Sequence, residues 1–354
     1  MRKSVILETH NLKNPTTGFG TFNYGLIKGL SNLDLGNLDL TLLAYKPGKI
    51  ADEFGDKFKY KKIYSFNRHK GFRIRKKHDL WHSVNQNLKF EPHKTSNYLL
   101  TVHDVNFVES AKKPCKYYKA FLEKLERSNA ITYISEYAKE QAHRHFAIPN
   151  VPEYIIYNGN PITTYNDTTH YKPEVPTDKP FLYSIGDFLP KKNFIAIVEM
   201  MHHIPDFNLV ISGNNNKSYG EEVKEAIIAN KLEKRVFLTG KVSDSGKQYY
   251  LSNCSGFLFP SVGEGFGLPP IEAMKFGKPI FLANRTSLPE IGGEFSFYWD
   301  EFDPEYMASQ FYKGMESYNS NTDFYKEKYI ERSNMFNWDK ASKQYLDVYN
   351  SILK

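Results

Sequence analysis

The sequence holds only two cysteines, Cys115 and Cys254, without a C-x-x-C motif or a histidine pattern beside them. Such cysteines indicate neither a disulfide framework nor a zinc site, so we expect both to be reduced and buried as small hydrophobic side chains. Long apolar runs are also missing, because none approaches the roughly 20 residues that span a bilayer. A charge follows the start too soon for a signal peptide. These absences predict a cytoplasmic protein.

Acidic residues are absent from residues 57–78, which hold ten Lys or Arg residues in a chain whose net charge is only +7. Five aromatic residues are interleaved with these cations: Phe58, Tyr60, Tyr64, Phe66 and Phe72. This mixture suits a surface that meets anionic lipid headgroups. A solvated loop is the alternative. Nucleic acid is a further candidate partner, but no recognition helix or finger motif supports it.

The composition is that of a globular protein, with 40% hydrophobic and 25% charged residues. At 354 residues the chain is long enough for two domains. Apolar runs of strand length alternate with helical patterns in both halves. We therefore expect an α/β protein with two Rossmann-like, doubly wound domains that face a central cleft. The predicted parts are an N-terminal domain (1–160), a linker rich in Pro, Thr, Asn and Asp (161–180), a C-terminal domain (181–336) and a C-terminal helix (337–354).

Individual elements follow from the same periodicities. In the first half we expect strands at 5–7, 38–44, 80–84, 98–102, 130–134 and 154–157, and helices after residue 20, at 117–127 and at 136–145. In the second half we expect strands at 181–185, 207–211, 236–238 and 256–259. Its helices are predicted at 194–203, at 221–230, after Ser243, and from about residue 270 to Gly277.

The stretch that carries most information runs from Ser261 to Met274 and reads SVGEGFGLPPIEAM. Its alternate glycines allow backbone N–H groups to approach an anion closely. A proline in the first helical turn and Gly277 at the C′ position would frame a short helix, whose N-terminus favours phosphate. We expect Glu264 in the loop and Glu272 in the first helical turn to flank one cavity and to accept hydrogen bonds from sugar hydroxyls. Two solvated acids are the alternative.

The two glutamates, separated by seven residues with Gly-Phe-Gly-Leu-Pro between them, resemble the E-x7-E element of retaining GT-B glycosyltransferases, especially glycosyltransferase family 4. The resemblance continues through residues 273–280 and 287–293. It implies that Glu272 holds the donor ribose and Glu264 the sugar hydroxyls. It also implies that the donor diphosphate is held by the backbone of four residues: Gly265, Phe266, Gly267 and Leu268. A further implication is that the C-terminal helix (337–354) crosses back to the N-terminal domain.

Two further segments of the second half fit a nucleotide-sugar donor. Lys191 and Lys192 follow the predicted strand at 181–185, and a departing diphosphate needs positive charge. They resemble the Arg-Lys-Asn element of the family, with Lys191 in place of arginine, which removes the bidentate fork. Two exposed lysines on a loop are the alternative. Lys241 and Val242 match the turn that lies near the nucleobase in the family.

The first half contributes Gly18, Gly20 and His103. The glycines lie between the first strand and helix, where the full G-x-G-x-x-G is missing, and the resemblance implies that they face the donor diphosphate. His103 follows the strand at 98–102, and the carboxyl ends of parallel strands are where ligands gather. It matches the His-Asp element of the family, whose histidine lies beside the reacting sugar. For Asp104, helix capping or fixing of the histidine tautomer is the alternative role.

The resemblance implies a retaining glycosyltransferase of the hexosyltransferase type, with His103 and Glu264 as catalytic residues. Its donor would be a nucleotide diphosphate sugar. Its acceptor would be a glycan or lipid-linked glycan of bacterial surface polysaccharide or lipopolysaccharide assembly. No D-x-D triplet occurs, so we expect metal-independent activity without a cofactor. If residues 57–78 bind lipid, the protein would be peripheral on the inner face of the cytoplasmic membrane. The alternatives are a sugar-nucleotide epimerase of the same fold and a non-catalytic sugar-nucleotide or nucleic-acid binding protein.

Overall fold

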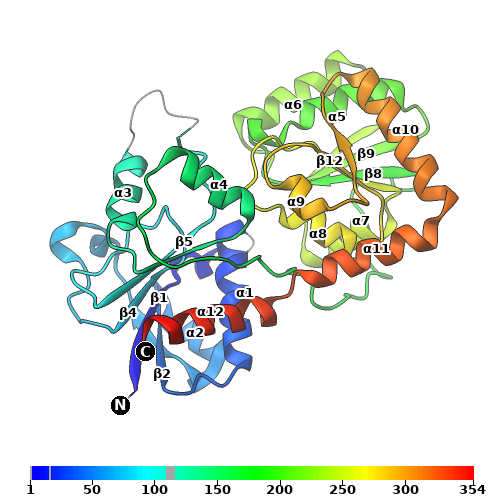
Figure 1. The fold of residues 1–354 in the computed structure, drawn as a ribbon. Coiled ribbons are helices and arrows are strands. Elements are labelled where there is room, and N and C mark those ends of the chain that lie inside the picture. Colours follow the sequence, from blue (N-terminus) through cyan, green and yellow to red (C-terminus); the bar gives the residue numbers. More distant parts are fainter. Residues whose placement is uncertain (1, 16, 109–115) are drawn as a thin grey trace. The chain divides into compact units, whose positions relative to one another are not determined.

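The computed structural model describes residues 2–15, 17–108 and 116–354, so that Cys115 lies outside the described residues. The chain divides into two compact units, drawn in Figure 1. The first unit comprises residues 1–161 and 337–354, and the second comprises residues 162–336. Residues 162–180, which the sequence predicts as a linker, are counted with the second unit. Each unit is a parallel sheet with helices around it, which confirms the predicted pair of Rossmann-like domains.

The first unit has a seven-stranded sheet in the order β3-β2-β1-β4-β5-β6-β7. Its strands are β1 (Lys3–Glu8), β2 (Leu38–Ala44), β3 (Lys59–Lys62), β4 (Leu80–Ser83), β5 (Asn97–Val102), β6 (Ala130–Tyr133) and β7 (Glu153–Ile155). Its helices are α1 (Gly18–Asn32), α2 (Pro47–Phe54), α3 (Lys116–Leu125), α4 (Glu136–His145) and α12 (Trp338–Ile352). Short 3₁₀ helices lie between these elements: η1 (His10–Lys13), η2 (Gly55–Lys57), η3 (Ser65–Arg68) and η4 (Lys70–Phe72).

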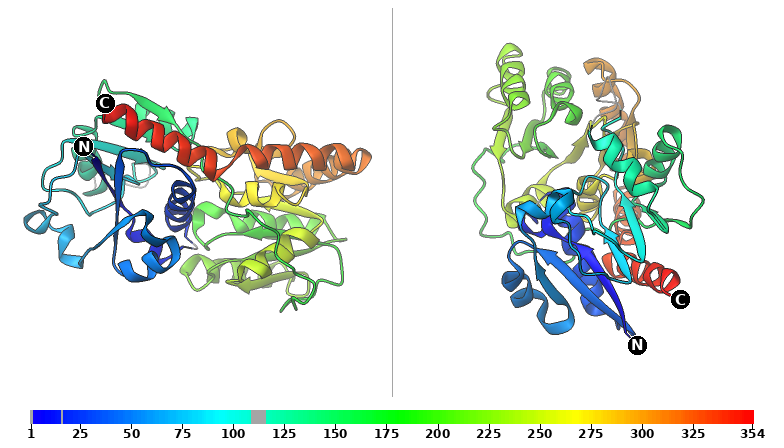
Figure 2. Two further views of the ribbon diagram at one scale, coloured as in Figure 1. Left: turned by 90° about the horizontal axis from the view of Figure 1, so that it is seen from below. Right: turned by 90° about the vertical axis from the view of Figure 1, so that its left-hand side faces the viewer.

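The C-terminal helix α12 packs against α1 and closes the core of the first unit (Figures 1 and 2). Two buried tyrosines of α12 reach the sheet. His82 Nδ1 lies 2.8 Å from the Tyr349 hydroxyl and its Nε2 lies 2.8 Å from Thr101 Oγ1, while the Tyr345 hydroxyl lies 3.5 Å from the same Thr101 oxygen. Because all of these groups are buried, the hydrogen bonds satisfy polar atoms that would otherwise be costly inside a core.

The second unit has a six-stranded sheet in the order β10-β9-β8-β11-β12-β13. Its strands are β8 (Phe181–Ile185), β9 (Asn208–Ser212), β10 (Val236–Gly240), β11 (Gly256–Phe259), β12 (Ile280–Ala283) and β13 (Phe297–Trp299). Its helices are α5 (Phe194–Met200), α6 (Ser218–Ala229), α7 (Asp244–Asn253), α8 (Leu268–Met274), α9 (Leu288–Gly292), α10 (Pro304–Ser320) and α11 (Thr322–Met335). The 3₁₀ helices η5 (Pro190–Lys192) and η6 (Met201–His203) flank α5.

Most strands lie within two residues of their predicted positions, and the differences have local causes. The helix predicted after Gly20 begins at Gly18, because Thr17 caps it through a hydrogen bond from the Gly20 N–H to Thr17 Oγ1 (3.2 Å). The strands β3, β12 and β13 were not predicted. β3 consists of Lys-Tyr-Lys-Lys at the edge of its sheet, where lysine is common because it discourages pairing with another chain. Residues 57–78 are therefore not one loop, because they contain β3, η3 and η4.

Candidate functional site

The second unit has its topological switch between β8 and β11, the two central neighbours of the sheet. From β8 the chain continues to β9 and β10 on one side, and it returns with β11 on the other side. In open α/β sheets, ligands bind beyond the carboxyl ends of the strands at this position. The two segments that leave these carboxyl ends are residues 186–193 and 260–267. They contain both predicted lysines, Glu264 and the glycines of the predicted loop.

Hydrogen bonds join these two segments directly. The Lys191 carbonyl accepts from the Val262 N–H at 2.8 Å and from Ser261 Oγ at 3.0 Å. The glycine at position 263 leaves room for the Lys191 side chain, because a Cβ there would lie 3.3 Å from its carbons. The structure thus brings the predicted lysine pair and the predicted glutamate loop into one cluster.

Glu264 is the centre of this cluster. Its Oε1 accepts from Lys192 Nζ at 2.5 Å and from Ser261 Oγ at 2.6 Å. Burial raises the pKa of the carboxyl, but the charges of Lys192 and Lys191 outweigh burial and hold the pKa below its ordinary value. Glu264 is therefore ionised at neutral pH. Its second oxygen, Oε2, has no hydrogen-bond partner among the residues that the structure describes.

Glu272 is held in a similar way by a different lysine. Its Oε1 accepts from Lys247 Nζ, on α7, at 2.7 Å, and its side chain is 8% exposed. Burial raises the pKa of Glu272, and the neighbouring Lys247 offsets this effect only in part. Within the described part of the chain, Oε2 of Glu272 has no hydrogen-bond partner either. Sequence reasoning did not single out Lys247, because no spacing rule links it to a glutamate 25 residues later.

The backbone around Glu264 is locally strained. Three non-glycine residues have a positive φ among the described residues, and two of them flank this loop: Asn193 (φ 52°) and Thr286 (φ 55°). The Thr286 hydroxyl accepts from the Glu264 N–H at 3.3 Å. Ser287 Oγ donates to the carbonyl oxygens of Glu264 (3.2 Å) and Phe266 (2.7 Å). Left-handed non-glycine residues cost about 1–3 kcal/mol each and gather at functional sites.

The helix that follows the loop differs from the prediction in its limits. α8 spans only seven residues and starts at Leu268, so Glu272 lies in its second turn and not in its first. It ends at Met274, three residues before Gly277, which has a φ of 63° and donates to the Met274 carbonyl (2.9 Å). Gly267 precedes the helix with a φ of 114°, a conformation that L side chains rarely adopt.

The remaining predicted donor residues occupy two positions of the second unit. Lys191 is half-buried, and its Nζ has no ion-pair partner among the described residues. Lys241 is exposed and Val242 is half-buried, and both lie between β10 and α7. Because α7 also carries Lys247, this connection is linked to Glu272 through the Lys247 ion pair.

His103 lies at the carboxyl end of β5 in the first unit and is 6% exposed. Its Nε2 donates to the Val84 carbonyl (2.9 Å), and its backbone N–H donates to Gln86 Oε1 (3.0 Å). Burial lowers the pKa of His103 to about 4, so the ring is neutral with its proton on Nε2. The Val84 carbonyl therefore fixes the tautomer. Asp104 accepts instead from the Asn106 N–H at 3.2 Å.

The predicted glycine turn of the first unit is part of a helix. Gly18 and Gly20 are the first and third residues of α1, and the Gly20 N–H already donates to Thr17. A Cβ at Gly20 would lie 1.9 Å from the Asn14 carbonyl oxygen, so this glycine permits the preceding loop to pack closely. This packing accounts for glycine at position 20 without a ligand.

One polar pair of the first unit was missed. Glu8, at the end of β1, is fully buried, and its Oε1 lies 2.8 Å from His10 Nδ1. The strand β1 neighbours β4, and the switch of this sheet lies between them. An acidic residue directly after a buried apolar strand is the signal that could have revealed the pair.

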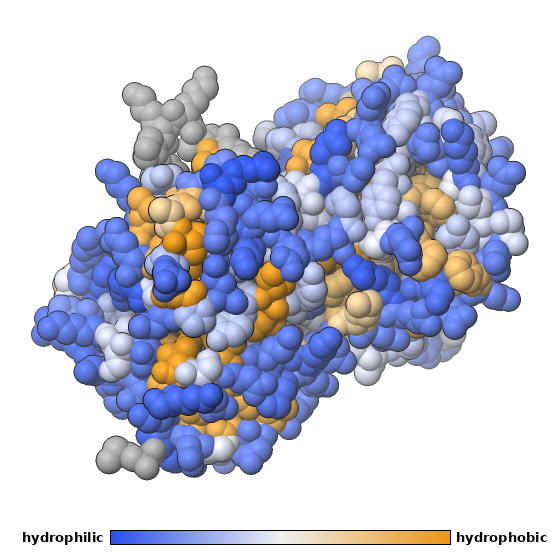
Figure 3. All heavy atoms as spheres, in the orientation of Figure 1, coloured by the Kyte–Doolittle hydropathy of each residue, from blue (hydrophilic) through white to orange (hydrophobic). Residues whose placement is uncertain are grey.

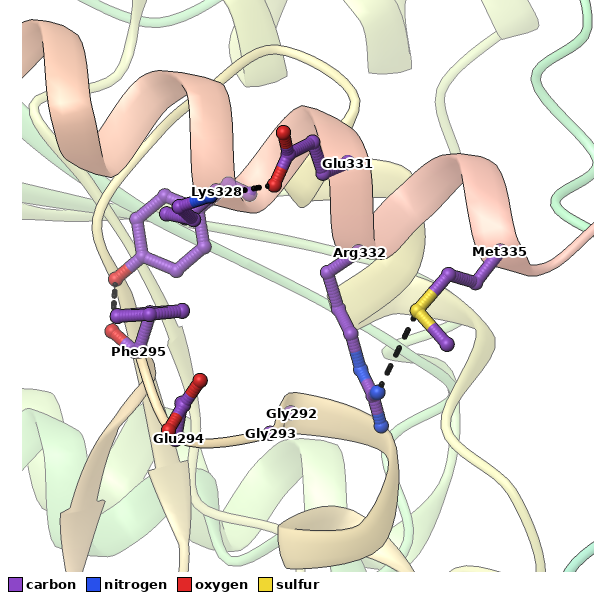
Figure 4. Close-up of a pocket in the computed structure, with 9 residues that line it drawn as sticks. Gly292, Gly293, Glu294, Phe295, Lys328, Glu331, Arg332 and Met335 are labelled. Atoms are coloured by element: carbon purple, nitrogen blue, oxygen red, sulfur yellow. Dashed lines mark hydrogen bonds and ion pairs between the residues drawn. The ribbon is translucent and has the colours of Figure 1, made fainter.

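A pocket of about 310 Å³ lies in the second unit between α11 and the segment that joins α9 to β13 (Figure 4). Arg332 and Met335 lie on one side and Glu294 on the other. None of the predicted donor-binding residues lines it.

In residues 2–15, 17–108 and 116–354, no group of three or more His, Cys, Asp or Glu side chains is placed to hold a metal ion. No helix in the described part of the chain is long and apolar enough to cross a membrane. Cys254 is buried as predicted.

Comparison with known proteins finds related sequences and folds. Residues 166–330 match the family described as "Glycosyl transferases group 1". The chain is 22% identical over 284 residues to the O-antigen chain mannosyltransferase B of Escherichia coli. The aligned region covers 74% of this chain and 72% of the relative. It spans less than a third of the serotype-specific mannosyltransferases WbdA of Escherichia coli that it also matches.

Solved structures share the fold over the whole chain. A glycosyltransferase from Rickettsia africae ESF-5 superposes with a TM-score of 0.75 at 17% identity, covering 100% of this chain and 99% of that one. Anabaena Alr3699/HepE, solved in complex with UDP and glucose, superposes with a TM-score of 0.71 at 13% identity, covering 99% and 100%. The fold is therefore GT-B, and the findings together support a GT-B glycosyltransferase.

Proposed function

We propose that this chain is a retaining glycosyltransferase that moves a sugar from a nucleotide diphosphate sugar to a hydroxyl group of a glycan. The observation that carries the proposal is the cluster at the β8–β11 switch. There Glu264 pairs through one carboxylate oxygen with the buried Lys192, and Glu272 pairs in the same way with the half-buried Lys247. The other oxygen of each carboxylate has no hydrogen-bond partner among the described residues. A carboxylate oxygen of this kind can accept hydrogen bonds from sugar hydroxyls, and each charge-assisted hydrogen bond contributes about 1.5–3 kcal/mol.

The two lysines of the loop after β8 take different roles in this proposal. Lys192 is engaged with Glu264 and holds its carboxylate in place. Lys191, which has no ion-pair partner in the described residues, is the cation available to the diphosphate as the bond to the sugar breaks. The backbone of residues 265–268 and the turn at Lys241 and Val242 complete the proposed donor contacts. Glu272 holds the ribose and Glu264 the transferred sugar.

His103 is the proposed contribution of the first unit. Its Nε2 proton is used by the Val84 carbonyl, which leaves Nδ1 as a hydrogen-bond acceptor. A neutral imidazole with a fixed tautomer can accept a hydrogen bond from a sugar hydroxyl without adding charge beside the breaking bond. Gly18 and Gly20 are proposed to lie near the donor diphosphate. The Gly20 N–H is not proposed as a donor to it, because this N–H already donates to Thr17.

The acceptor is proposed from the relatives. Similarity to O-antigen mannosyltransferases favours a glycan of bacterial surface polysaccharide or lipopolysaccharide, carried on a lipid. A lipid-linked acceptor would bring the basic residues 57–78 of the first unit to the inner face of the cytoplasmic membrane. The retaining stereochemistry follows from the resemblance of the E-x7-E element.

A donor panel tests the proposal. Thermal shifts with UDP-, GDP- and ADP-linked sugars, mannose among them, are expected to identify one donor that raises the Tm of the protein. Release of the nucleoside diphosphate should then require a glycan acceptor. Isomerised donor in a reaction without acceptor would identify an epimerase instead, and binding without any turnover over an acceptor panel would identify a non-catalytic binding protein.

A further inference from the structure

The first unit contains a pocket of about 370 Å³ that joins the basic stretch to α3. We infer that this pocket binds a phosphate ester. The inference goes beyond the proposed function, because it concerns residues of the first unit that take no part in the donor contacts.

The lining of the pocket is strongly positive. Seven of the lining side chains are basic and two are acidic. The η3 and η4 segments provide Arg68, Lys70 and Arg73, and α3 with the turn after it provides Lys119, Lys124 and Arg127. The seventh cation is Lys89. Four of these seven residues lie outside residues 57–78, so the charge cluster is a product of the fold and not of the basic stretch alone.

The inner wall of the pocket is built from buried charges. Lys124 is 2% exposed, and its Nζ donates to the carbonyl oxygens of Gln86 (2.9 Å) and Leu88 (2.7 Å). The same Nζ lies 3.3 Å from Glu91 Oε1, and Arg127 Nη1 lies 3.1 Å from Glu91 Oε2. Glu91 therefore pairs with two cations of the lining, and the charge of Glu8 also acts on Lys124.

The outer wall holds cations that are only weakly engaged. Glu123, whose side chain is 48% exposed, lies 3.4 Å from Lys70 Nζ and 3.9 Å from Arg73 Nη2. Exposed ion pairs of this length contribute little, about 0–1 kcal/mol. The Nε of Arg73 is buried and has no hydrogen-bond partner in the part of the chain that the structure describes. Lys89 and Lys119 are exposed and form no ion pair with any described residue.

A phosphate ester matches this arrangement better than a carboxylate does. It carries up to two negative charges and three acceptor oxygens, and it can engage a guanidinium fork and several ammonium groups together. Seven basic and two acidic lining side chains give a surplus of five positive charges, of which a phosphate dianion offsets two and a single carboxylate only one.

Exposed aromatic rings adjoin the η3 and η4 cations in sequence. Phe66 is 49% exposed and Phe72 is 60% exposed, and their centroids lie 5.5 Å apart. Tyr64 stacks on Phe66 at 5.3 Å. Such rings suit a phosphate that is carried by a lipid, whereas a water-soluble phosphate ester would need only the pocket. In the lipid and in the water-soluble ester, the group that the pocket would recognise is the same phosphate.

Binding measurements with the full chain separate the two sources. Calorimetry at fixed ionic strength would use glycerol 3-phosphate as the soluble probe and succinate as a dicarboxylate control. Sedimentation would use phosphatidylcholine vesicles that contain phosphatidic acid, with oleic acid vesicles of equal surface charge as the control. Binding of glycerol 3-phosphate and of phosphatidic acid vesicles supports recognition of the phosphate itself. Binding of the phosphatidic acid vesicles alone supports a lipid-borne phosphate. Failure with both probes, or equal binding of the carboxylate controls, overturns the inference.

Two charge-reversal variants locate the site. Lys89→Glu with Lys119→Glu changes two exposed residues of the pocket, so folding is not at risk. Lys46→Glu with Lys49→Glu changes two exposed residues at α2, outside the pocket, by the same net charge. The first pair should weaken phosphate binding by at least about tenfold and the second pair by less than about twofold. Equal losses in the two variants would show a general charge effect and overturn the site. Donor binding, measured by thermal shift in both variants, should stay unchanged.

Discussion

Glu264 and Glu272 differ in their environments although both belong to one sequence element. The pKa of Glu264 is held below its ordinary value and that of Glu272 above it, because two lysines surround the first carboxylate and only Lys247 faces the second. The E-x7-E spacing predicts that the two acids lie near each other. It cannot predict their lysine partners, since those come from η5 and α7.

Replacement of Glu272 tests its role in donor binding. Glu272→Gln keeps the shape of the side chain but removes the charge, so the proposed hydrogen bonds to the ribose lose their charge assistance. The KM for the donor is expected to rise by about tenfold or more, the equivalent of about 1.4 kcal/mol or more. Steady-state kinetics measure the change. The exposed Glu233 offers a matched control, because Glu233→Gln removes the same charge away from the site. Unchanged donor KM in a folded Glu272→Gln protein would refute the assignment.

Buried histidines make the first unit sensitive to acid. Burial lowers the pKa of His82 to about 3 and that of His103 to about 4, whereas both have their ordinary value of about 6.5 in the unfolded chain. The unfolded state therefore binds more protons below pH 6.5, and the stability that is fully present above this pH is lost as the pH falls towards 4. Each histidine contributes a slope of about 1.4 kcal/mol per pH unit in this window.

Denaturant unfolding between pH 7.5 and 5 measures this slope. His82→Gln should lower stability at pH 7.5 and should also reduce the slope between pH 6 and 5. A slope that is the same in the variant and the parent protein would show that His82 does not titrate as described.

The contact between α1 and α12 shows how the packing partner of a helix determines which residues the helix can contain. The apolar patterns predict both helices, and the family resemblance implies that the C-terminal helix returns to the N-terminal domain, but neither identifies α1 as the helix that it packs against. Gly25 faces the Trp338 ring, and a Cβ at Gly25 would lie 2.1 Å from that ring. Glycine is a poor helix former, but at Gly25 and Gly29 it is explained by close packing against α12.

A matched pair of glycine replacements tests this contact. Gly25→Ala should lower the free energy of unfolding by about 1–3 kcal/mol, because the methyl group has no room beside Trp338. Gly48→Ala in α2 should be neutral or stabilising by up to about 1 kcal/mol, since nothing lies within 4 Å of its added Cβ. Denaturant midpoints measure both changes, and equal effects of the two replacements would contradict the packing argument.

At the scale of the whole molecule, each unit has its own sheet and its own hydrophobic core. Hydrophilic side chains cover most of the face drawn in Figure 3, with smaller hydrophobic patches between them. The first unit receives the helix α12 from residues 338–352, which follow the whole second unit in the sequence.

Metal independence is a prediction for the whole enzyme. Because Lys191 and the loop backbone are proposed to neutralise the diphosphate, turnover should change by less than about twofold when EDTA is added. The measurement is product formation with and without chelator, with a second series in added Mg²⁺. Loss of turnover on chelation and its recovery with Mg²⁺ would show that a metal ion supplies the charge.

The sequence by itself determined the α/β alternation, nearly all central strands, the position of the glutamate loop and the presence of cations near it. These features depend on residue type and on short-range periodicity, which a single chain displays directly. Only the tertiary structure decided that Lys192 pairs with Glu264 across 72 positions and that Lys247 pairs with Glu272. It also decided that Lys89, Lys119, Lys124 and Arg127 join the basic stretch around one pocket. The physical reason is that such pairs form where strand order and helix packing bring distant segments together, and strand order is set by burial over the whole sheet.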